Sequence, residues 1–476
     1  MADKLWDQIY THVPIWVQNV IVGFKGLQFR YQRNNDQILR ERFHFLLESQ
    51  YWSSSQFRDY QVQQLQQLLN IAFRHVPYYR DLRKKLGCNP EDFKEPEDIR
   101  LLPTLSKSQV RGNESFFLNE TVDLRTCDIG STSGTTGTPL KTYGNQESFS
   151  SKWAFVARLR HWAGVTEPFY PKRAQFTGRP IVPKNQSSEK HIYWRWNIPG
   201  NSLLFSAYHL SPKAVPYYVK ALQDFKPELI DGFPSSLLII VRVSRRLGLK
   251  LPNPKAIIVS AETHLPEHRK ELQEAFGCRV FDLYSATDPS GFWCDCEYGV
   301  MHENPEAGIS EILDDKDHPV QAGVAGEVVF TPFYNKVMVF IRYKLGDMAV
   351  KDNSERCLCN RNMPKIKSLE GRKEDILYVP DRGYITGIAP LSGLSNIIEG
   401  QIIQEDLNHI RVLLIPDTGY NQDIEDRLLN KLHIQISSSV NITIEKVDQL
   451  FRGPGGKIRP IISKVQHLYP DDMRLY

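Results

Sequence analysis

The apolar run at residues 256–261, Ala-Ile-Ile-Val-Ser-Ala, most constrains the fold of this chain. It shows no alternation of polar and apolar residues, which is typical of a strand buried on both faces. A helix is predicted over 266–276 and a second strand over 279–283. A strand, a helix and a strand of these lengths predict a parallel sheet, because parallel strands need a long crossover connection. We therefore expect an α/β protein.

The chain has 476 residues, which is too many for one ordinary core, so more than one domain is expected. The part before about residue 100 reads as helical, since apolar residues recur at spacings of three and four. The last hundred residues read as α+β, with a strand at 410–415, a helix at 423–432 and a strand at 441–447. Residues 372–375 are charged and turn-prone. We expect them to form the hinge between a large domain, 1–371, and a small domain, 376–476.

Charge and cysteine content narrow the partners and the compartment. The net charge is only +4 with 24% charged residues, and the chain has no long basic run, so we expect no nucleic-acid partner. The seven cysteines are an odd number spread along a long chain, which does not indicate a disulfide framework. A reducing compartment, the cytoplasm, is therefore predicted.

The N-terminal segment 13–27 is apolar but is interrupted by Pro14, Gln18, Asn19 and Lys25. It is too short and too polar to span a bilayer, and it lacks the pattern of a secretory signal. It could form an amphipathic helix. We favour a helix that packs on the protein's own surface, with peripheral contact to a membrane as the alternative.

Residues 131–141, Ser-Thr-Ser-Gly-Thr-Thr-Gly-Thr-Pro-Leu-Lys, hold six hydroxyl side chains and two glycines. Hydroxyl and backbone N–H groups can wrap several phosphate oxygens, and Lys141 adds a positive charge. The stretch is not a Walker phosphate loop, because Pro139 stands where that motif needs its second glycine. It predicts a phosphate-binding loop, with a flexible surface loop as the alternative.

Three chemically useful side chains follow the predicted strand at 279–283. Tyr284 can stack on a base, the hydroxyl of Thr287 can reach a phosphate, and the carboxylate of Asp288 can hold Mg²⁺. Ligands of parallel sheets bind beyond the carboxyl ends of the strands, so these residues are expected to face a crevice. An ordinary turn is the alternative.

Two further turns carry residues that could act on a nucleotide. Asp347 follows Gly346, and a carboxylate can accept hydrogen bonds from both ribose hydroxyls. Lys457 lies in the stretch 453–458, Gly-Pro-Gly-Gly-Lys-Ile. An ammonium group there could stabilise the crowding of negative charge as a carboxylate approaches a phosphate. A simple turn is the alternative in each case.

Together these segments resemble the motifs of the adenylate-forming superfamily, which contains acyl-CoA synthetases, peptide-synthetase adenylation domains and luciferases. The Gly/Thr stretch resembles its nucleotide-phosphate loop, which implies that phosphate is bound by Ser133, Gly134, Thr135, Thr136, Gly137 and Lys141. Residues 282–288 are similar to the Tyr-Gly-x-Thr-Glu motif, with Ser285 in place of Gly and Asp288 in place of Glu. The resemblance implies that Thr287 and Asp288 take part in catalysis, with Asp288 on magnesium.

The resemblance also assigns the rest of the nucleotide site. Asp347 closes a segment similar to Tyr-Arg-Thr-Gly-Asp and would hold the ribose hydroxyls. Arg372, in a Gly-Arg-x-x-Asp stretch, would approach the ribose or a phosphate. The strand end that would lie along the adenine, mostly through backbone atoms, comprises Ser260, Ala261 and Glu262. Lys457 would bridge the carboxylate and the α-phosphate oxygens as the acyl-adenylate forms.

Segments 75–80, 206–211 and 232–237 resemble the phenylacetate–CoA ligase group, and look closest to its capsular-polysaccharide-biosynthesis (CapK-type) members. The resemblance implies a large domain of layered sheets and helices, followed by a small α+β lid. It also implies that a carboxylic acid and MgATP give an acyl-adenylate and pyrophosphate, after which the acyl group is transferred. The acceptor is either the thiol of CoA or an amine, such as an amino sugar or amino acid. A third hypothesis is a nucleotide-binding scaffold without catalysis.

A group of cysteines and one histidine has the composition of a zinc site. The best set of four ligands is Cys296, His302, Cys357 and Cys359, and Cys294 is the alternative ligand. Zinc prefers four nitrogen or sulfur ligands in a tetrahedron, and four protein ligands leave no open position, which indicates a structural role. Some relatives of phenylacetate–CoA ligase have zinc ligands of a similar pattern. A group of buried free thiols is the alternative.

Overall fold

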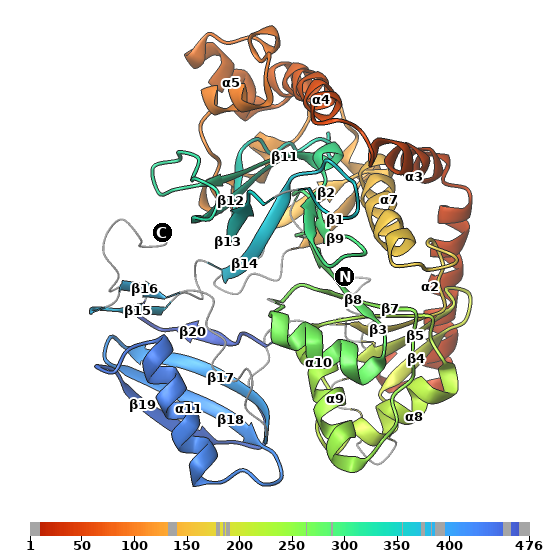
Figure 1. Ribbon diagram of the computed structural model, residues 1–476. Helices are drawn as coiled ribbons and strands as arrows, with labels where there is room; N and C mark the ends of the chain where they lie inside the picture. The colour runs from red at the N-terminus through yellow and green to blue at the C-terminus, as the bar shows by residue number, and fades with distance from the viewer. Residues whose placement is uncertain are drawn as a thin grey trace. The chain divides into compact units, whose positions relative to one another are not determined.

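The computed structural model describes residues 10–131, 140–177, 181–183, 186, 191–262, 264–286, 289–354, 356–372, 377–381, 383–385, 396–450 and 458–465. The chain divides into two compact units, each built from segments that are far apart in the sequence (Figure 1). The first unit combines Met1–Asn35, Ala163–Phe281 and Glu374–Leu475. The second unit combines Asp36–Trp162 and Asp282–Lys373.

The first unit contains a mainly parallel sheet with the strand order β7-β6-β3-β5-β4. The parallel strands are β3 (Arg173–Thr177), β5 (Ser202–Ser206), β6 (Leu229–Gly232) and β7 (Ala256–Ser260). The edge strand β4 (Trp194–Asn197) pairs antiparallel with β5. β7 is the predicted apolar strand, and its first four residues are buried. The expected α/β sheet is confirmed.

Helices accompany these strands in the first unit. They are α2 (Ile15–Asn34), α8 (Val215–Phe225), α9 (Pro234–Leu247) and α10 (Pro266–Phe276). α9 and α10 each begin with proline and end at a left-handed glycine, Gly248 and Gly277, which supplies the usual start and stop signals. α8 and α9 share a core with the sheet that includes the buried residues Leu203, Phe205, Tyr218, Leu222, Leu237 and Val241.

The C-terminal part of the first unit is a four-stranded sheet with the order β19-β18-β17-β20. Its strands are β17 (Ile397–Asp406), β18 (His409–Pro416), β19 (Asn441–Lys446) and β20 (Ile461–Ser463). Helix α11 (Gln422–Gln435) lies across this sheet (Figure 1) and buries Ile424, Leu428 and Leu432 in a shared core. A small hairpin, β15 (Leu377–Val379) and β16 (Gly383–Ile385), precedes it. The α+β pattern predicted for the last hundred residues is confirmed.

The second unit contains an antiparallel sheet with the order β11-β12-β13-β14-β10-β9-β8. The bounds are β8 (Arg279–Tyr284), β9 (Trp293–Asp295), β10 (Met301–Glu303), β11 (Gly308–Leu313), β12 (Ala325–Pro332), β13 (Tyr343–Asp352) and β14 (Lys365–Arg372). The short strands β1 (Asp128–Ser131) and β2 (Lys141–Gly144) form a separate antiparallel pair. This arrangement places the ends of β8 and β14 and the middle of β13, which carry predicted nucleotide residues, in one sheet.

Most helices of the second unit come from the N-terminal region that was predicted to be helical. They are α3 (Gln37–Ser49), α4 (Ser54–His75), α5 (Pro77–Leu86), α6 (Lys107–Val110) and α7 (Gln146–Trp162). Short 3₁₀ turns connect them, at Pro90–Asp92, Pro96–Leu101, Glu114–Phe117, Leu124–Thr126 and, before β11, Pro305–Ala307. α4 begins at a Ser53–Gln56 capping box, and its buried face carries Leu65, Leu69 and Phe73. Among the described helices, none offers an apolar stretch long enough to cross a bilayer.

Candidate nucleotide site and metal centre

Part of the predicted site lies outside the described residues. These positions are Ser133, Gly134, Thr135, Thr136, Gly137, Thr287, Asp288 and Lys457. The residues that flank the predicted phosphate loop are described: Ser131, the last residue of β1, pairs with Lys141, the first residue of the antiparallel strand β2. Lys141 is exposed, whereas the preceding Leu140 is buried. The pairing of β1 with β2 therefore holds the two ends of the Gly/Thr stretch next to each other.

Tyr284 and Asp347, two residues predicted to bind the nucleotide, are in direct contact. The phenol of Tyr284, at the end of β8, donates a hydrogen bond of 2.7 Å to Oδ2 of Asp347 in β13. Asp347 also pairs in register with Arg372, the last residue of β14. The sheet thus brings together three of the predicted nucleotide positions, which are separated by up to 88 positions in the sequence (372 − 284).

The ring of Tyr284 is held by other aromatic side chains. Its centroid lies 5.1 Å from that of Trp293 and 6.3 Å from that of Phe330, in tilted arrangements. Trp293 and Phe330 are both buried in the same apolar cluster. Because the ring is fixed from the core side, its hydroxyl is fixed relative to the carboxylate of Asp347. A carboxylate oriented in this way can accept hydrogen bonds from a pair of neighbouring hydroxyls.

Glu262 has a role that the sequence did not indicate. Its carboxylate accepts hydrogen bonds from the backbone N–H and the hydroxyl of Ser235, each 3.0 Å long. Ser235 lies in the first turn of α9, where backbone N–H groups lack helical partners and negative charge is favourable. The carboxylate also accepts a 3.2 Å hydrogen bond from the backbone N–H of Ile458.

These contacts concern the predicted adenine-binding strand end. Ser260 is the last residue of β7, and Ala261 has the left-handed φ of 69°, which is unusual for a residue other than glycine. The prediction for Ser260, Ala261 and Glu262 was contact through backbone atoms. The structure adds that the side chain of Glu262 joins the start of α9 to the residue that follows Lys457 in the chain. The sequence alone could suggest only that a carboxylate such as that of Glu262 caps the start of a helix. It could not identify the partners, because Ser235 and Ile458 lie 27 and 196 positions away.

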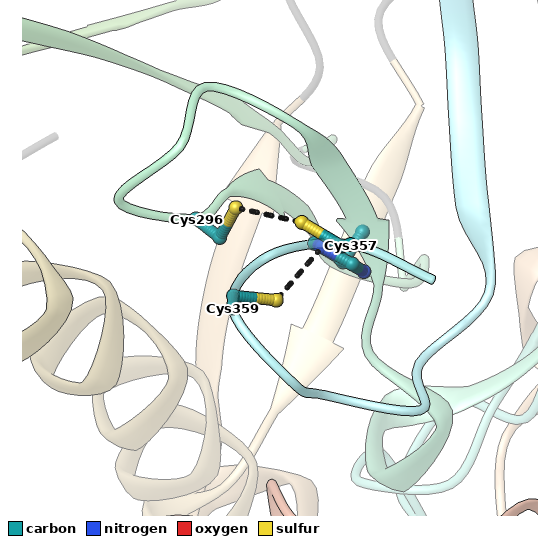
Figure 2. Close-up of side chains that lie close together, drawn as sticks. Cys296, Cys357 and Cys359 are labelled. Carbon is teal, nitrogen blue, oxygen red and sulfur yellow. Dashed lines mark hydrogen bonds between the residues drawn. The ribbon is translucent and has the colours of Figure 1, made fainter. Parts of the chain in front are cut away.

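The four predicted zinc ligands lie together. One ligand atom from each of Cys296, His302, Cys357 and Cys359 falls within 4.8 Å of the others, and all four residues are buried. Cys296 follows β9, His302 lies in β10, and the other two cysteines lie between β13 and β14. Figure 2 shows the side chains of Cys296, Cys357 and Cys359 gathered at one point.

The distances within this group match a tetrahedron around zinc. Bonds of about 2.3 Å to sulfur and about 2.05 Å to nitrogen give edges of about 3.8 Å between two sulfurs and about 3.5 Å between sulfur and nitrogen. The Sγ atoms of Cys296 and Cys357 are 3.6 Å apart (Figure 2), and Sγ of Cys359 lies 3.5 Å from Nε2 of His302. The arrangement is therefore already close to the geometry that the metal requires.

Contacts to His302 and Cys359 favour the forms of these two side chains that bind metals. Nδ1 of His302 lies 3.2 Å from the carbonyl oxygen of Met363, a partner that places the ring proton on Nδ1 and leaves Nε2 able to bind a metal. A hydrogen bond from the Cys296 thiol, with a smaller contribution from His302, lowers the pKa of Cys359 to about 3. A thiolate is the form of cysteine that ligates metals.

Cys294, the alternative ligand, is not part of the group. Its Sγ lies against the side-chain amide of Asn304, with 3.6 Å between sulfur and Nδ2. Burial raises the pKa of the Cys294 thiol to about 11, so it stays protonated. The structure therefore separates the two neighbouring cysteines of the Cys-x-Cys pair into one member of the cluster and one buried thiol.

Comparison with known proteins gives the same assignment as the motifs. Residues 377–464 match the model of the CapK C-terminal domain. The chain is 28% identical to Protein CapK of Staphylococcus aureus, over 97% of this chain and 100% of the relative. It is 23% identical to phenylacetate–coenzyme A ligase of Thermus thermophilus, over 85% of this chain and 96% of the relative. It is 25% identical to phenylacetate–coenzyme A ligase of Escherichia coli, over 67% of this chain and 72% of the relative.

Solved structures agree on the fold. The chain superimposes on 2-hydroxyisobutyryl-CoA ligase in the postadenylation state, in complex with 2-HIB-AMP, with a TM-score of 0.68 and 17% identity, covering 88% of this chain and 92% of that one. The predicted resemblance is thus confirmed: in sequence the chain is similar to CapK and to phenylacetate–coenzyme A ligases, and in fold it is similar to 2-hydroxyisobutyryl-CoA ligase.

Proposed function

We propose that this chain is an AMP-forming ligase that activates a carboxylic acid with MgATP and then transfers the acyl group to the thiol of CoA. The hydrogen bond between Tyr284 and Asp347, opposite Arg372, carries the proposal, because it joins residues that separate motifs assign to one nucleotide. The names of the phenylacetate–coenzyme A ligases support CoA as the acceptor.

The residues have distinct proposed tasks. Asp347 accepts hydrogen bonds from the two ribose hydroxyls, and Tyr284 fixes the orientation of its carboxylate. The phosphate loop and Lys141 hold the triphosphate, while Asp288 ligates Mg²⁺ and Thr287 contacts a phosphate. Arg372 approaches the ribose or a phosphate. The strand end 260–262 lies along the adenine.

The proposed chemistry has two steps. In the first, a carboxylate oxygen attacks the α-phosphorus of ATP, the bond from that phosphorus to the bridging oxygen breaks, and pyrophosphate leaves. The ammonium of Lys457 stabilises the negative charge that gathers at the α-phosphate as the two anions meet. In the second step the sulfur of CoA, having lost its proton, attacks the acyl carbon and AMP leaves. Mg²⁺ neutralises charge on the phosphates when it is bound.

We propose a structural zinc ion at Cys296, His302, Cys357 and Cys359. The observed separations of 3.6 Å and 3.5 Å fit tetrahedral coordination without large movement. Four protein ligands fill the coordination sphere, so the metal would hold the β9–β10 turn to the connection between β13 and β14.

We propose the division into a large domain, 1–371, and a lid, 376–476, with a hinge at 372–375. It is supported by the match of residues 377–464 to a separate C-terminal domain. The two compact units follow a different division, because the unit that contains Glu374–Leu475 also contains Ala163–Phe281.

One assay tests the function and separates it from its alternatives. ATP–pyrophosphate exchange is measured over a panel of carboxylic acids, and CoA esters are then sought with CoA present. We expect exchange with at least one acid and a CoA ester of that acid. Exchange without any CoA ester would favour an amine acceptor in place of CoA. Absence of exchange with every acid would favour a scaffold without catalysis.

The lysine gives a second test. Lys457→Ala should abolish exchange, because no cation then stabilises the approach of carboxylate to α-phosphate, while ATP binding largely persists. Normal turnover in this variant would contradict the role assigned to Lys457.

A further inference from the structure

Helix α2 attaches to the first unit through polar contacts. Arg195 of β4 donates a 2.7 Å hydrogen bond from Nε to Oε1 of Gln18, and both side chains are buried. The backbone N–H of Trp196 donates to Oδ1 of Asn19 at 3.0 Å. Further along the helix, Arg30 donates to the carbonyl oxygen of Pro199 at 3.0 Å. The helix therefore packs on the protein's own surface, as the sequence favoured.

The packed face of α2 lies close to β4. A Cβ atom added at Gly26 would lie 1.7 Å from Oδ1 of Asn197, so a larger residue there would require the Asn197 side chain to move. Gly26 is itself buried. The orientation of the helix about its axis is thus fixed by glycine, amide and guanidinium groups.

The opposite face of α2 carries most of its large exposed apolar side chains. At 3.6 residues per turn, one stripe about 80° wide contains Trp16, Val20, Phe24, Leu27 and Tyr31. Their exposed fractions are 69%, 62%, 70%, 54% and 71%. A helix of a water-soluble protein normally turns its apolar stripe toward the core. In α2 the arrangement is inverted, since Gln18 is buried while Phe24 faces outward.

The composition of the helix favours one kind of partner. Residues 15–34 contain no aspartate or glutamate, whereas they contain Lys25, Arg30 and Arg33. Tryptophan and tyrosine, which begin and end the stripe, prefer the boundary between lipid headgroups and acyl chains. The net positive charge of the helix, together with its exposed aromatic stripe, matches an anionic lipid surface in both charge and polarity.

We propose that α2 is an in-plane membrane anchor, whose exposed stripe inserts into the headgroup region of an anionic phospholipid bilayer while its other face stays on β4. The helix lies on the bilayer and does not cross it, in line with the absence of a spanning stretch among the described helices. The anchor would hold a ligase of this kind next to lipid-bound acids or acceptors, but the inference does not depend on the activity.

Vesicle flotation of the full chain tests the anchor. Binding is measured to vesicles of phosphatidylcholine alone and of phosphatidylcholine mixed with phosphatidylglycerol. We expect binding to the anionic vesicles, with weaker binding as salt is raised, because salt screens the contact between basic residues and lipid. Phe24→Ser should weaken partitioning about tenfold, since one buried ring is lost from the lipid contact.

Phe29→Ser is the matched control. Phe29 is 54% exposed on the same helix, but it lies about 140° around the axis from Phe24, outside the stripe. The affinity of the Phe29→Ser variant for vesicles should be within about twofold of that of the unmodified chain, because the ring that the substitution removes does not enter the lipid. Circular dichroism melts check that both variants fold.

Three outcomes would overturn the proposal: no binding to either kind of vesicle, equal loss of binding in Phe24→Ser and Phe29→Ser, or a dimer in light scattering that Phe24→Ser dissociates without any vesicle binding. The last result would make a second copy of the chain the occupant of the stripe. ATP–pyrophosphate exchange in solution should be the same in both variants, so failure of the anchor is distinguishable from failure of the proposed ligase activity.

Discussion

Ile458 donates its backbone N–H to the carboxylate of Glu262, although the two residues are 196 positions apart. The same carboxylate accepts two hydrogen bonds from Ser235 at the start of α9. Because Ile458 directly follows Lys457 in the chain, Glu262 holds the backbone next to the lysine. We infer that Glu262 positions the lysine and does not itself act on the reacting atoms.

The first prediction concerns this carboxylate. In the unmodified chain Oε1 of Glu262 accepts from the Ser235 hydroxyl and the Ile458 N–H, and Oε2 accepts from the Ser235 N–H. Glu262→Gln replaces one of these oxygens by an amide NH₂, which cannot accept a hydrogen bond, so the three contacts cannot all be kept. We expect the rate of ATP–pyrophosphate exchange to fall about tenfold, with ATP affinity changed less than about twofold. Glu267→Gln, at an exposed position in the first turn of α10, is the control and should leave both unchanged. An exchange rate in Glu262→Gln equal to that of the control would refute the positioning role.

The second prediction concerns the ribose contact. Tyr284→Phe keeps the ring against Trp293 but removes the hydrogen bond to Asp347. A neutral donor to a carboxylate contributes on the order of 1 kcal/mol, so the KM for ATP should rise about fivefold while the fold is kept. The measurement is exchange rate against ATP concentration. Tyr217→Phe, in α8, removes a comparable hydroxyl elsewhere and should leave KM unchanged. A similar KM in both variants would remove Tyr284 from the nucleotide site.

The third prediction concerns the metal. Mass spectrometry of the purified protein should find about one zinc per chain, since four buried cysteine and histidine ligand atoms lie within 4.8 Å of one another. Cys359→Ser should lose most of the metal and melt several degrees lower. Cys294→Ser, a change of another buried cysteine in the same region, should keep its zinc. Equal metal loss in both variants, or metal-free protein as stable as the loaded form, would contradict the assignment.

The fourth prediction concerns stability and pH. Arg158 and Glu306 form an ion pair of 2.7 Å between side chains that are 1% and 0% exposed. Burial alone raises the pKa of Glu306, but the charge and hydrogen bonds of Arg158, with a hydrogen bond from Ser49, outweigh it and hold the pKa below its usual 4.5. A lowered folded pKa means that the stabilisation is complete above about pH 4.5 and is lost as pH falls through the folded pKa.

Glu306→Gln leaves Arg158 buried without its partner, which typically costs about 3–5 kcal/mol. We therefore expect a lower free energy of unfolding at pH 7 in urea titrations. The difference between the two proteins should shrink as the pH falls below about 4.5, because Glu306 then takes up a proton in the unmodified chain. A difference that stays constant from pH 7 to acid would mean that the ion pair does not account for the loss.

The sequence was a good guide where local pattern decides structure. Proline and glycine at the ends of α10, and the unbroken apolar run of β7, were sufficient to place a helix and a strand. The sequence could also group the four zinc ligands by type and spacing. Its choice of Cys296 over Cys294 agrees with the structure, but the reason is visible only there: Cys296 lies in the group with His302, whereas the thiol of Cys294 lies against Asn304.

Contacts between residues far apart in the chain could not be predicted from the sequence. The resemblance named Tyr284 and Asp347 separately, but their hydrogen bond joins two strands, β8 and β13, that are not neighbours in the sheet, and the tyrosine ring packs on an aromatic cluster. The amphipathic N-terminal helix was expected, but the sequence did not show which of its faces packs on the protein. That face is set by Arg195, a buried guanidinium 177 positions from its partner Gln18.

The closeness of Cys296 and Cys357 has a topological consequence. A bridge between them, through a metal or through oxidation, would close a ring spanning 61 positions of chain. A covalent closure of that size removes about 4 kcal/mol of conformational freedom from the denatured ensemble. Asp347 lies within that span of chain and Tyr284 outside it, so opening such a ring should loosen the Asp347 side of their hydrogen bond and leave the Tyr284 side in place.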